Sequence, residues 1–143
     1  MRAAQFAPWL IASAAGVIGV LGLAHLWVTV RGNALQPRDP ALAALWAQSH
    51  LHITRANPIA RVWLGFNHSH SLGALQFSLI WSWLALAQPE LLFGSPFLLG
   101  LGAAVLLVYN LLAWAYWFHI PQRGVCAAAV LYLAGVICHF WAG

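Results

Sequence analysis

Four long apolar segments, almost free of charge, constrain this chain more than any other feature of its sequence. They cover residues 8–30, 60–88, 96–119 and 124–142. Each has roughly the 20 residues that a helix needs to cross the hydrocarbon core of a bilayer, which is about 30 Å thick. Because the later connections are short, neighbouring segments should run antiparallel. The sequence therefore predicts an all-α polytopic membrane protein, with four transmembrane helices in an antiparallel bundle.

Composition supports a single membrane domain over residues 1–143. Hydrophobic residues make up 63% of the chain and charged residues only 6%, whereas roughly 25% of residues are charged in an average soluble domain. Six arginines and two acidic residues cannot cover the surface of a soluble core of this size. The arginines are scattered singly and do not form the clustered basic stripe that nucleic-acid binding requires. We therefore expect a lipid bilayer around the chain and no nucleic-acid partner.

The connection at residues 31–59 is the longest in the chain and carries a helical signal of its own. Asp39 is a suitable N-cap, and Pro40 suits the first position of a helix. The apolar residues that follow fall on one helical face: Leu42, Leu45 and Trp46. We expect a short interfacial helix in this first loop.

The arginines also predict the orientation of the chain. Most of them lie in the first and third connections: Arg31, Arg38, Arg55, Arg61 and Arg123. The opposite side carries only Arg2 and Glu90. Because cytoplasmic loops are enriched in basic residues, the sequence predicts a multi-pass protein whose loop 31–59 is cytoplasmic. Both termini would lie on the opposite face, which is the periplasmic face if the membrane is the bacterial inner membrane.

Four histidines are predicted at a similar depth near the cytoplasmic face. Counted along the predicted helices from the nearest arginine, all lie within about 15 Å of that face: His25, His68, His70 and His119. Ionisable side chains inside a membrane are costly and mostly point into the bundle, so each is a candidate cofactor ligand. A hydrogen bond at the headgroup level is the simpler explanation for His119, near a helix end. For the three deeper histidines, structural and functional roles both stay open.

Helical spacing separates His68 from His70. The two lie about 200° apart around a helix, so they cannot both ligate one centre inside the bundle. A small, polar stripe repeats along the same helix: Asn67, Ser71, Ala74 and Ser78. Such a stripe favours close packing and hydrogen bonds between helices. Asn110 is a further polar candidate in the third span, either pairing across helices or lining a quinone or lipid-headgroup pocket with Tyr109 and Gln76.

Two tetrapyrrole cofactors suit these histidines. Haem b needs inward imidazoles from two helices, which His25 with His68 or His70 would supply. A chlorin such as bacteriochlorophyll needs one histidine with aromatic residues to pack the macrocycle. The segment Ala24-His25-Leu26-Trp27, followed by Arg31, is similar to the histidine region of bacterial light-harvesting polypeptides.

A metal ion or a catalytic centre has less support. A metal site would want a carboxylate or a thiolate in reach, but Asp39 and Glu90 lie in connections, and Cys126 is the only thiol near the histidine-rich face. Cys126 and Cys138 are about 18 Å apart if the segment is helical, too far for a disulfide. With no lysine in the chain and no carboxylate in a span, nucleophilic or acid–base catalysis lacks an orienting group. We therefore favour a protein that is not an enzyme.

The stretch Gly65-Phe66-Asn67-His68-Ser69-His70-Ser71-Leu72-Gly73 resembles a GFN-x-SH-x-LG pattern found in small uncharacterised bacterial membrane proteins with four spans. The resemblance extends to the order of one span, a cytoplasmic loop and three closely spaced spans. It implies the fold and the membrane location and carries no activity. His70 occupies the fixed histidine of the pattern and His68 a variable position, which favours His70 as the residue with a function.

Taken together, the sequence predicts a non-enzymatic accessory or assembly subunit of a larger bacterial membrane complex, of respiratory or photosynthetic type. Its partners would be the bilayer and other membrane subunits. The alternative is a carrier of histidine-ligated haem or chlorin, and a further alternative is a small transporter or proton-pathway protein. The partner complex, any substrate and the oligomeric state stay open at this point.

Overall fold

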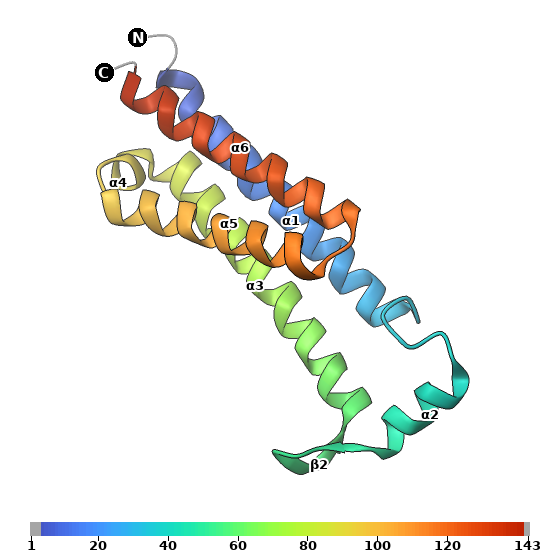
Figure 1. The fold of residues 1–143 in the computed structure, drawn as a ribbon. Helices are drawn as coiled ribbons and strands as arrows, with labels where there is room; N and C mark the ends of the chain where they lie inside the picture. Colours follow the sequence, from blue (N-terminus) through green and yellow to red (C-terminus); the bar gives the residue numbers. More distant parts are fainter. Residues whose placement is uncertain (1–3, 142–143) are drawn as a thin grey trace. The chain divides into compact units, whose positions relative to one another are not determined.

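The computed structural model describes residues 4–141 and is almost entirely helical (Figure 1). A short 3-10 turn at Ala4–Phe6 is followed by these elements: α1 (Ala7–Arg31), α2 (Pro40–Gln48), β1 (His50–Leu51), β2 (Thr54–Pro58), α3 (Ile59–Ala87), α4 (Pro89–Phe93), α5 (Pro96–Tyr116) and α6 (His119–Trp141). The predicted all-α class is confirmed. Arg2, which entered the orientation prediction, and the predicted end of the fourth span at residue 142 lie outside the described residues.

Among residues 4–141, three helices are long and apolar enough to cross a membrane: α1, α5 and α6. α3 is longer, at 29 residues, but it does not reach the same mean hydropathy. Its polar side chains, such as Asn67, His70 and Gln76, account for the difference. The structure therefore supports a membrane protein with three candidate spans, and the fourth span predicted at 60–88 stays a proposal.

Predicted capping residues mark the beginning of two helices. Asp39 Oδ1 accepts a hydrogen bond from the Ala41 amide at 2.9 Å where α2 begins. At the start of α5, Ser95 Oγ accepts the backbone N–H three residues later at 3.3 Å. Pro40 and Pro96 follow the caps, at positions where the helix needs no backbone N–H. The helix predicted in the first loop is thereby confirmed.

The boundary between the last two long helices differs from the prediction. We expected the third span to end at His119 and the fourth to begin at residue 124, with Pro121 between them. Instead, α6 begins at His119, and only Trp117 and Phe118 connect it to α5. Pro121 falls in the first turn of α6, where a missing N–H loses no hydrogen bond because the first four N–H groups have no partner within the helix. His119 therefore opens α6 instead of closing α5.

Between α3 and α5 the structure has the five-residue helix α4, where the sequence predicted only a short turn. Pro89 stands in its first turn and Gly94 ends it. Leu92 is fully buried. The connection is therefore packed against the rest of its unit by an apolar side chain.

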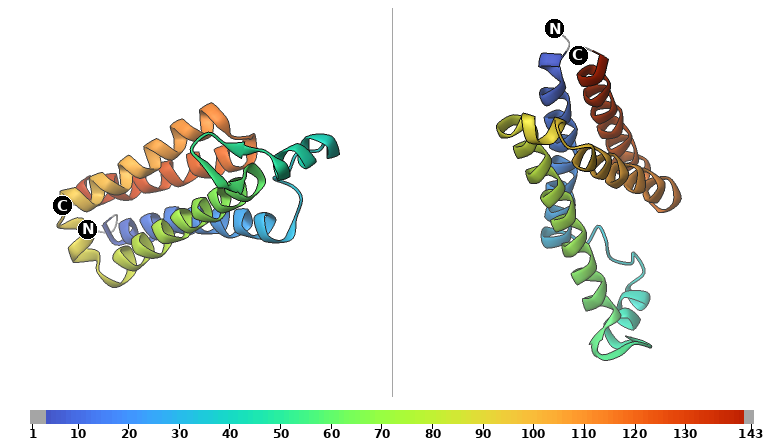
Figure 2. Two further views of the ribbon diagram at one scale, coloured as in Figure 1. Left: turned by 90° about the horizontal axis from the view of Figure 1, so that it is seen from below. Right: turned by 90° about the vertical axis from the view of Figure 1, so that its left-hand side faces the viewer.

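One compact unit comprises residues 1–21 and 74–143, within the limits of the described chain. Its apolar core draws side chains from α1, α3, α4, α5 and α6. The largest fully buried ones include Ile11, Leu92, Leu106 and Tyr132. α5 and α6 lie side by side and run antiparallel, as their two-residue connection requires (Figure 2).

Residues 22–73 form the second unit, with the end of α1, the loop carrying α2, the two strands and the first half of α3. β1 and β2 pair antiparallel, with His50 opposite Pro58 and Leu51 opposite Thr54. The sequence did not predict these strands because β1 has only two residues and β2, with the sequence TRANP, lacks the alternation of apolar and polar residues that marks a strand. α2 has no buried residue; on its apolar face Leu42 and Leu45 are exposed, whereas Trp46 is half-buried.

Candidate functional site

Two of the predicted histidines come together in the unit of residues 22–73. His25, near the end of α1, and His70, in the first half of α3, have ring centroids 5.0 Å apart and ring planes at 77°. This is an edge-to-face contact, in which the positive edge of one ring meets the face of the other. Both side chains are half-buried. Helical spacing allowed only one of His68 and His70 to share a centre with His25, and the structure brings His70 to it.

Asn67 joins this pair and identifies the tautomer of the His25 ring. Its amide Nδ2 donates to the Trp63 carbonyl at 2.8 Å, which identifies the other amide atom as the oxygen because a carbonyl only accepts. That oxygen, Oδ1, lies 3.1 Å from His25 Nε2. Nε2 therefore carries the proton of the neutral ring, an assignment that follows from the hydrogen-bond network. Asn67 itself is only 4% exposed, and both of its bonds are partly buried.

The hydroxyl groups around the cluster are satisfied inside their own helices. Thr29 Oγ1 donates to the His25 carbonyl at 2.7 Å, and Ser71 Oγ donates to the Asn67 carbonyl at 3.0 Å. Buried serine and threonine side chains often return a hydrogen bond to the carbonyl four residues earlier. Across residues 4–141, no buried side-chain nitrogen or oxygen lacks a partner. The buried side chains of Asn67, Ser71 and Thr29 therefore all have partners within the chain.

Aromatic side chains extend the cluster along one face of α3. The ring of His70 stacks on Phe66, with centroids 6.5 Å apart, and Phe66 stacks on Trp63 at 6.0 Å. Trp46 of α2 meets Trp63 edge-on, also at 6.0 Å. The Trp63 indole N–H donates to the Leu35 carbonyl at 2.8 Å. This aromatic row, formed by Trp46, Trp63, Phe66 and His70, ties the loop after α1 and α2 to α3.

The remaining predicted ligands do not join the cluster. His68 Nδ1 donates to the Leu64 carbonyl of its own helix at 2.8 Å. His119 is the exposed first residue of α6 and belongs to the other unit. Of the four candidate histidines, the structure therefore brings two together, His25 and His70.

The polar stripe of α3 lies in close packing. Asn67 and Ser71 are buried. Further along the helix, Ser78 faces Gly19 of α1, and a Cβ on Gly19 would meet the Ser78 hydroxyl. A small residue at this point lets two helices approach closely, as in other helix interfaces of membrane proteins.

Asn110 connects α5 to α6. Its Nδ2 donates to the Leu106 carbonyl of its own helix at 2.8 Å and to the Val125 carbonyl of α6 at 3.4 Å. Its partner in α6 is a backbone carbonyl, and the predicted association of Asn110 with Tyr109 and Gln76 stays a prediction. The residue therefore holds the last two helices together.

Tyr132 is a buried polar residue that the sequence analysis missed. It is 1% exposed, its hydroxyl donates to the Leu99 carbonyl at 3.0 Å, and that hydroxyl accepts the Trp81 indole N–H at 3.3 Å. A Cβ on Gly102 would meet both polar groups, so glycine leaves them room. The available signal was a tyrosine inside an apolar segment, whose hydroxyl must find a partner when buried. Tyr132 thereby joins α6 to α5 and α3.

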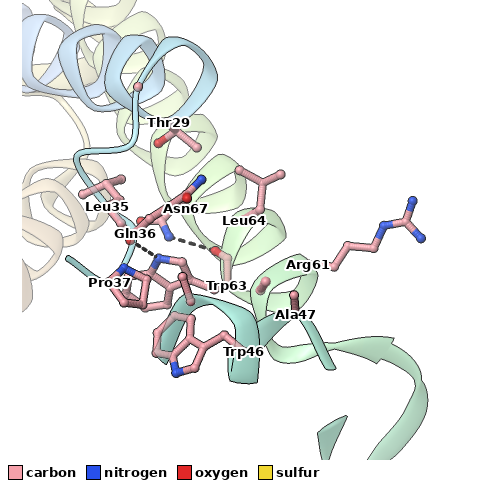
Figure 3. Close-up of a pocket in the computed structure, with 13 residues that line it drawn as sticks. Thr29, Leu35, Gln36, Pro37, Trp46, Ala47, Arg61, Trp63, Leu64 and Asn67 are labelled. Atoms are coloured by element: carbon pink, nitrogen blue, oxygen red, sulfur yellow. Dashed lines mark hydrogen bonds between the residues drawn. The ribbon is translucent and has the colours of Figure 1, made fainter. Parts of the chain in front are cut away.

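A pocket of about 330 Å³ lies beside the aromatic row, within the unit of residues 22–73 (Figure 3). Its walls come from the end of α1, the loop that follows, α2 and the start of α3, and include Leu35 and Trp46. Arg61 also borders it, but its side chain points away from the aromatic wall (Figure 3). The indole of Trp63 and the amide of Asn67 already bond within the chain. The pocket is therefore chiefly apolar.

The histidine cluster offers two imidazoles and no acid. Asp39 caps α2, and Glu90 lies in α4. Within the described part of the chain, no three side chains of the metal-binding types gather at one place. A catalytic triad needs a nucleophile, a base and an orienting group that are hydrogen-bonded one to the next, and the cluster does not have this arrangement. It can form hydrogen bonds, accept a proton or contribute imidazole ligands.

The stretch 65–73 supplies both Asn67 and His70, so the cluster contains the residues that carry the resemblance to small four-span bacterial proteins. No protein-family model matches the chain, and no curated protein or solved structure matches it significantly. That resemblance therefore stays an expectation.

Proposed function

We propose that this chain is a four-span protein of the bacterial inner membrane that acts as a non-enzymatic accessory or assembly subunit of a larger membrane complex. The main support is the small share of each apolar helix that the chain itself covers. Within the apolar stretch of 18 residues that could cross the membrane, 33% of the residues are buried in α1, and 22% in each of α5 and α6. The remaining apolar surface needs lipid or the helices of other subunits around it.

The length and the polar contacts of α3 support a fourth span. Its 29 residues reach about 43 Å, longer than the roughly 30 Å hydrocarbon core. Several of the polar residues that lower its hydropathy bond within the chain: Asn67 to His25 and Trp63, Ser71 and Ser69 to carbonyls of α3. These polar groups can enter lipid without being left unsatisfied.

The end of α1 supports the predicted orientation. The guanidinium of Arg31 lies over the ring of Trp27, 4.6 Å from its centre, a cation–π contact. Tryptophan is enriched at membrane interfaces, and arginine on their cytoplasmic side. Three further arginines follow: Arg38 and Arg55 lie in the connection, and Arg61 lies in the first turn of α3. In the proposed topology, this connection is cytoplasmic and both termini are periplasmic.

Reporter fusions test the number of spans. With four spans, fusions at the N- and C-termini report the same side of the membrane, which the arginines assign to the periplasm. Alkaline phosphatase fused to either end should then be active, and a fluorescent protein that folds only in the cytoplasm should stay dark. Termini on opposite sides would contradict the fourth span, because three spans place the ends across the membrane from each other.

Within this proposal, the cluster of His25, Asn67 and His70 holds α1 to α3. A macrocycle ligated by both histidines would have to stand between the two rings, but these are already in contact at 5.0 Å. In addition, Asn67 engages His25 Nε2. A structural hydrogen-bond lock therefore accounts for the geometry better than a bis-histidine haem.

A tetrapyrrole held by one histidine is the second candidate, and the aromatic row favours it. Phe66 stacks beside His70, and flat side chains of this kind would pack against a macrocycle. The visible absorption spectrum of the purified chain separates the two candidates. A Soret band that is lost in His70→Ala and kept in His68→Ala would establish the carrier. A colourless chain supports the subunit.

The assembly role is tested in the native host with a tagged chain extracted in mild detergent. We expect the chain to migrate on native gels in an assembly that contains other membrane subunits in fixed proportion. Removing the gene should lower the amount of that assembly while the activity per remaining assembly is unchanged. Migration without other subunits, with no change in any membrane complex on deletion, would refute the role.

A further inference from the structure

The outer face of α3 between residues 76 and 86 combines a polar amide with exposed apolar side chains. Gln76 is exposed, and its side chain has no hydrogen-bond partner among the described residues. On the same face, Leu79 is 72% exposed, Trp83 54% and Leu86 50%. These four residues, called the α3 seam below, form a large unpartnered surface on one helix.

The spacing of the α3 seam is that of a coiled coil. Positions 76, 79, 83 and 86 follow i, i+3, i+7 and i+10, which are the alternating a and d positions of a heptad repeat. Gln76 then stands at an a position, where a single polar residue fixes register and partner number in coiled coils. An open hollow of about 360 Å³ lies on this surface, lined by Leu79, Ile80, Trp83 and Leu84. A hollow of this kind can receive a side chain from a second helix.

The depth of Gln76 makes its lack of a partner costly. This inference rests on the proposed topology, in which α3 crosses the membrane. Gln76 is three residues from the midpoint of α3, about 5 Å along the axis. It therefore lies inside the hydrocarbon core, where water cannot satisfy an amide and an unpaired polar group is unfavourable.

We propose that the α3 seam binds the α3 seam of a second copy of this chain. Two copies with the same topology are related by a two-fold axis along the membrane normal, so their α3 helices run parallel and each seam residue faces its counterpart. A glutamine amide has both donors and an acceptor, so Gln76 of one copy satisfies Gln76 of the other at the same depth. The second copy supplies the missing partner by symmetry.

Cysteine cross-linking in native membranes tests the parallel pairing. In a full chain carrying Cys126→Ser and Cys138→Ser, we expect Leu79→Cys to give a disulfide-linked dimer on mild oxidation. Leu107→Cys, at an exposed leucine of α5 that is 60% accessible, serves as the matched control and should stay monomeric. Cross-linking at Leu107→Cys instead, or of Leu79→Cys to a different protein only, would overturn the proposal.

The role of the amide is tested by dilution of the labelled chain in lipid vesicles, with energy transfer as the readout. Gln76→Leu should weaken the dimer about 3- to 30-fold, the range measured for polar contacts between membrane helices. Gln76→Asn keeps an amide and should retain most of the affinity. Equal dimerisation of the Gln76→Leu variant and the parent chain would refute the pairing of the amides.

A membrane-impermeant thiol reagent separates this inference from the topology on which it rests. If α3 crosses the membrane, Leu79→Cys is not labelled in intact membranes. Labelling there would refute the fourth span. A protected Leu79→Cys that forms no dimer would leave the span intact and refute only the pairing of two copies.

Discussion

Replacing Asn67 with leucine should destabilise the protein by about 1–2 kcal/mol. The substitution is close to isosteric and opens no large cavity, but it removes the hydrogen bond between Oδ1 and His25 Nε2 at 3.1 Å. The N–H group of the half-buried His25 then loses its partner; an unpaired donor costs about 1–3 kcal/mol when it is fully buried, and less when it is partly exposed. Hydrogen bonds between membrane helices average nearer 0.6 kcal/mol, with a maximum of about 1.7 kcal/mol. The Trp63 carbonyl keeps its place in the helix and adds little.

A double-mutant cycle with His25→Phe isolates the contact. Phenylalanine keeps an aromatic ring beside His70 but has no N–H group to leave unpaired. Asn67→Leu should therefore cost about 1 kcal/mol less in the His25→Phe chain than in the parent. Reversible unfolding in mixed micelles of mild detergent and sodium dodecyl sulfate, followed by tryptophan fluorescence, measures all four chains.

His68→Phe is the matched control, because His68 bonds only to a carbonyl of its own helix. It should change the free energy of unfolding by no more than about 0.5 kcal/mol. If Asn67→Leu costs no more than this control, or if the two substitutions of the cycle are additive, the cluster does not hold the two helices together.

Three further substitutions test the packing of the other unit, again by unfolding in mixed micelles. Tyr132→Phe removes a hydroxyl that joins three helices and should cost about 0.5–1.5 kcal/mol, whereas Tyr116→Phe, at an exposed tyrosine, should be neutral. Gly102→Ala drives a methyl group toward Tyr132 and should cost about 1–3 kcal/mol. At Gly100 an added Cβ would meet nothing within 4 Å, so Gly100→Ala should stabilise the protein by up to about 1 kcal/mol. Equal effects of Gly102→Ala and Gly100→Ala would contradict the packing around Tyr132. Asn110→Leu should cost about 0.6–1.7 kcal/mol and speed hydrogen exchange at the start of α6; unchanged exchange there would count against the bond to α6.

Capping residues followed by proline predicted the starts of two helices correctly. Asp39 with Pro40, and Ser95 with Pro96, begin helices because a side-chain oxygen and a missing N–H both suit the first turn. Proline misled at residue 121 for a related reason. It can stand in the first turn of a helix as well as after the last one, and the sequence alone does not distinguish the two.

The candidate site was predictable in part. Helical periodicity separated His68 from His70, and the structure brings His70 to His25. The part played by Asn67 could not be derived, because a hydrogen bond between helices depends on their relative rotation and depth. Tyr132 was missed because its hydroxyl bonds across two neighbouring helices, and only their packing brings these partners together.

Native mass spectrometry of the tagged full chain, extracted from its own membranes, tests the role of an accessory subunit against that of a tetrapyrrole carrier. One spectrum reports both the assembly that contains the chain and any group that the chain carries. We expect an assembly with other membrane subunits and a chain whose mass includes no tetrapyrrole. A chain released without other subunits, or one that carries a tetrapyrrole lost in His70→Ala, would refute the subunit role.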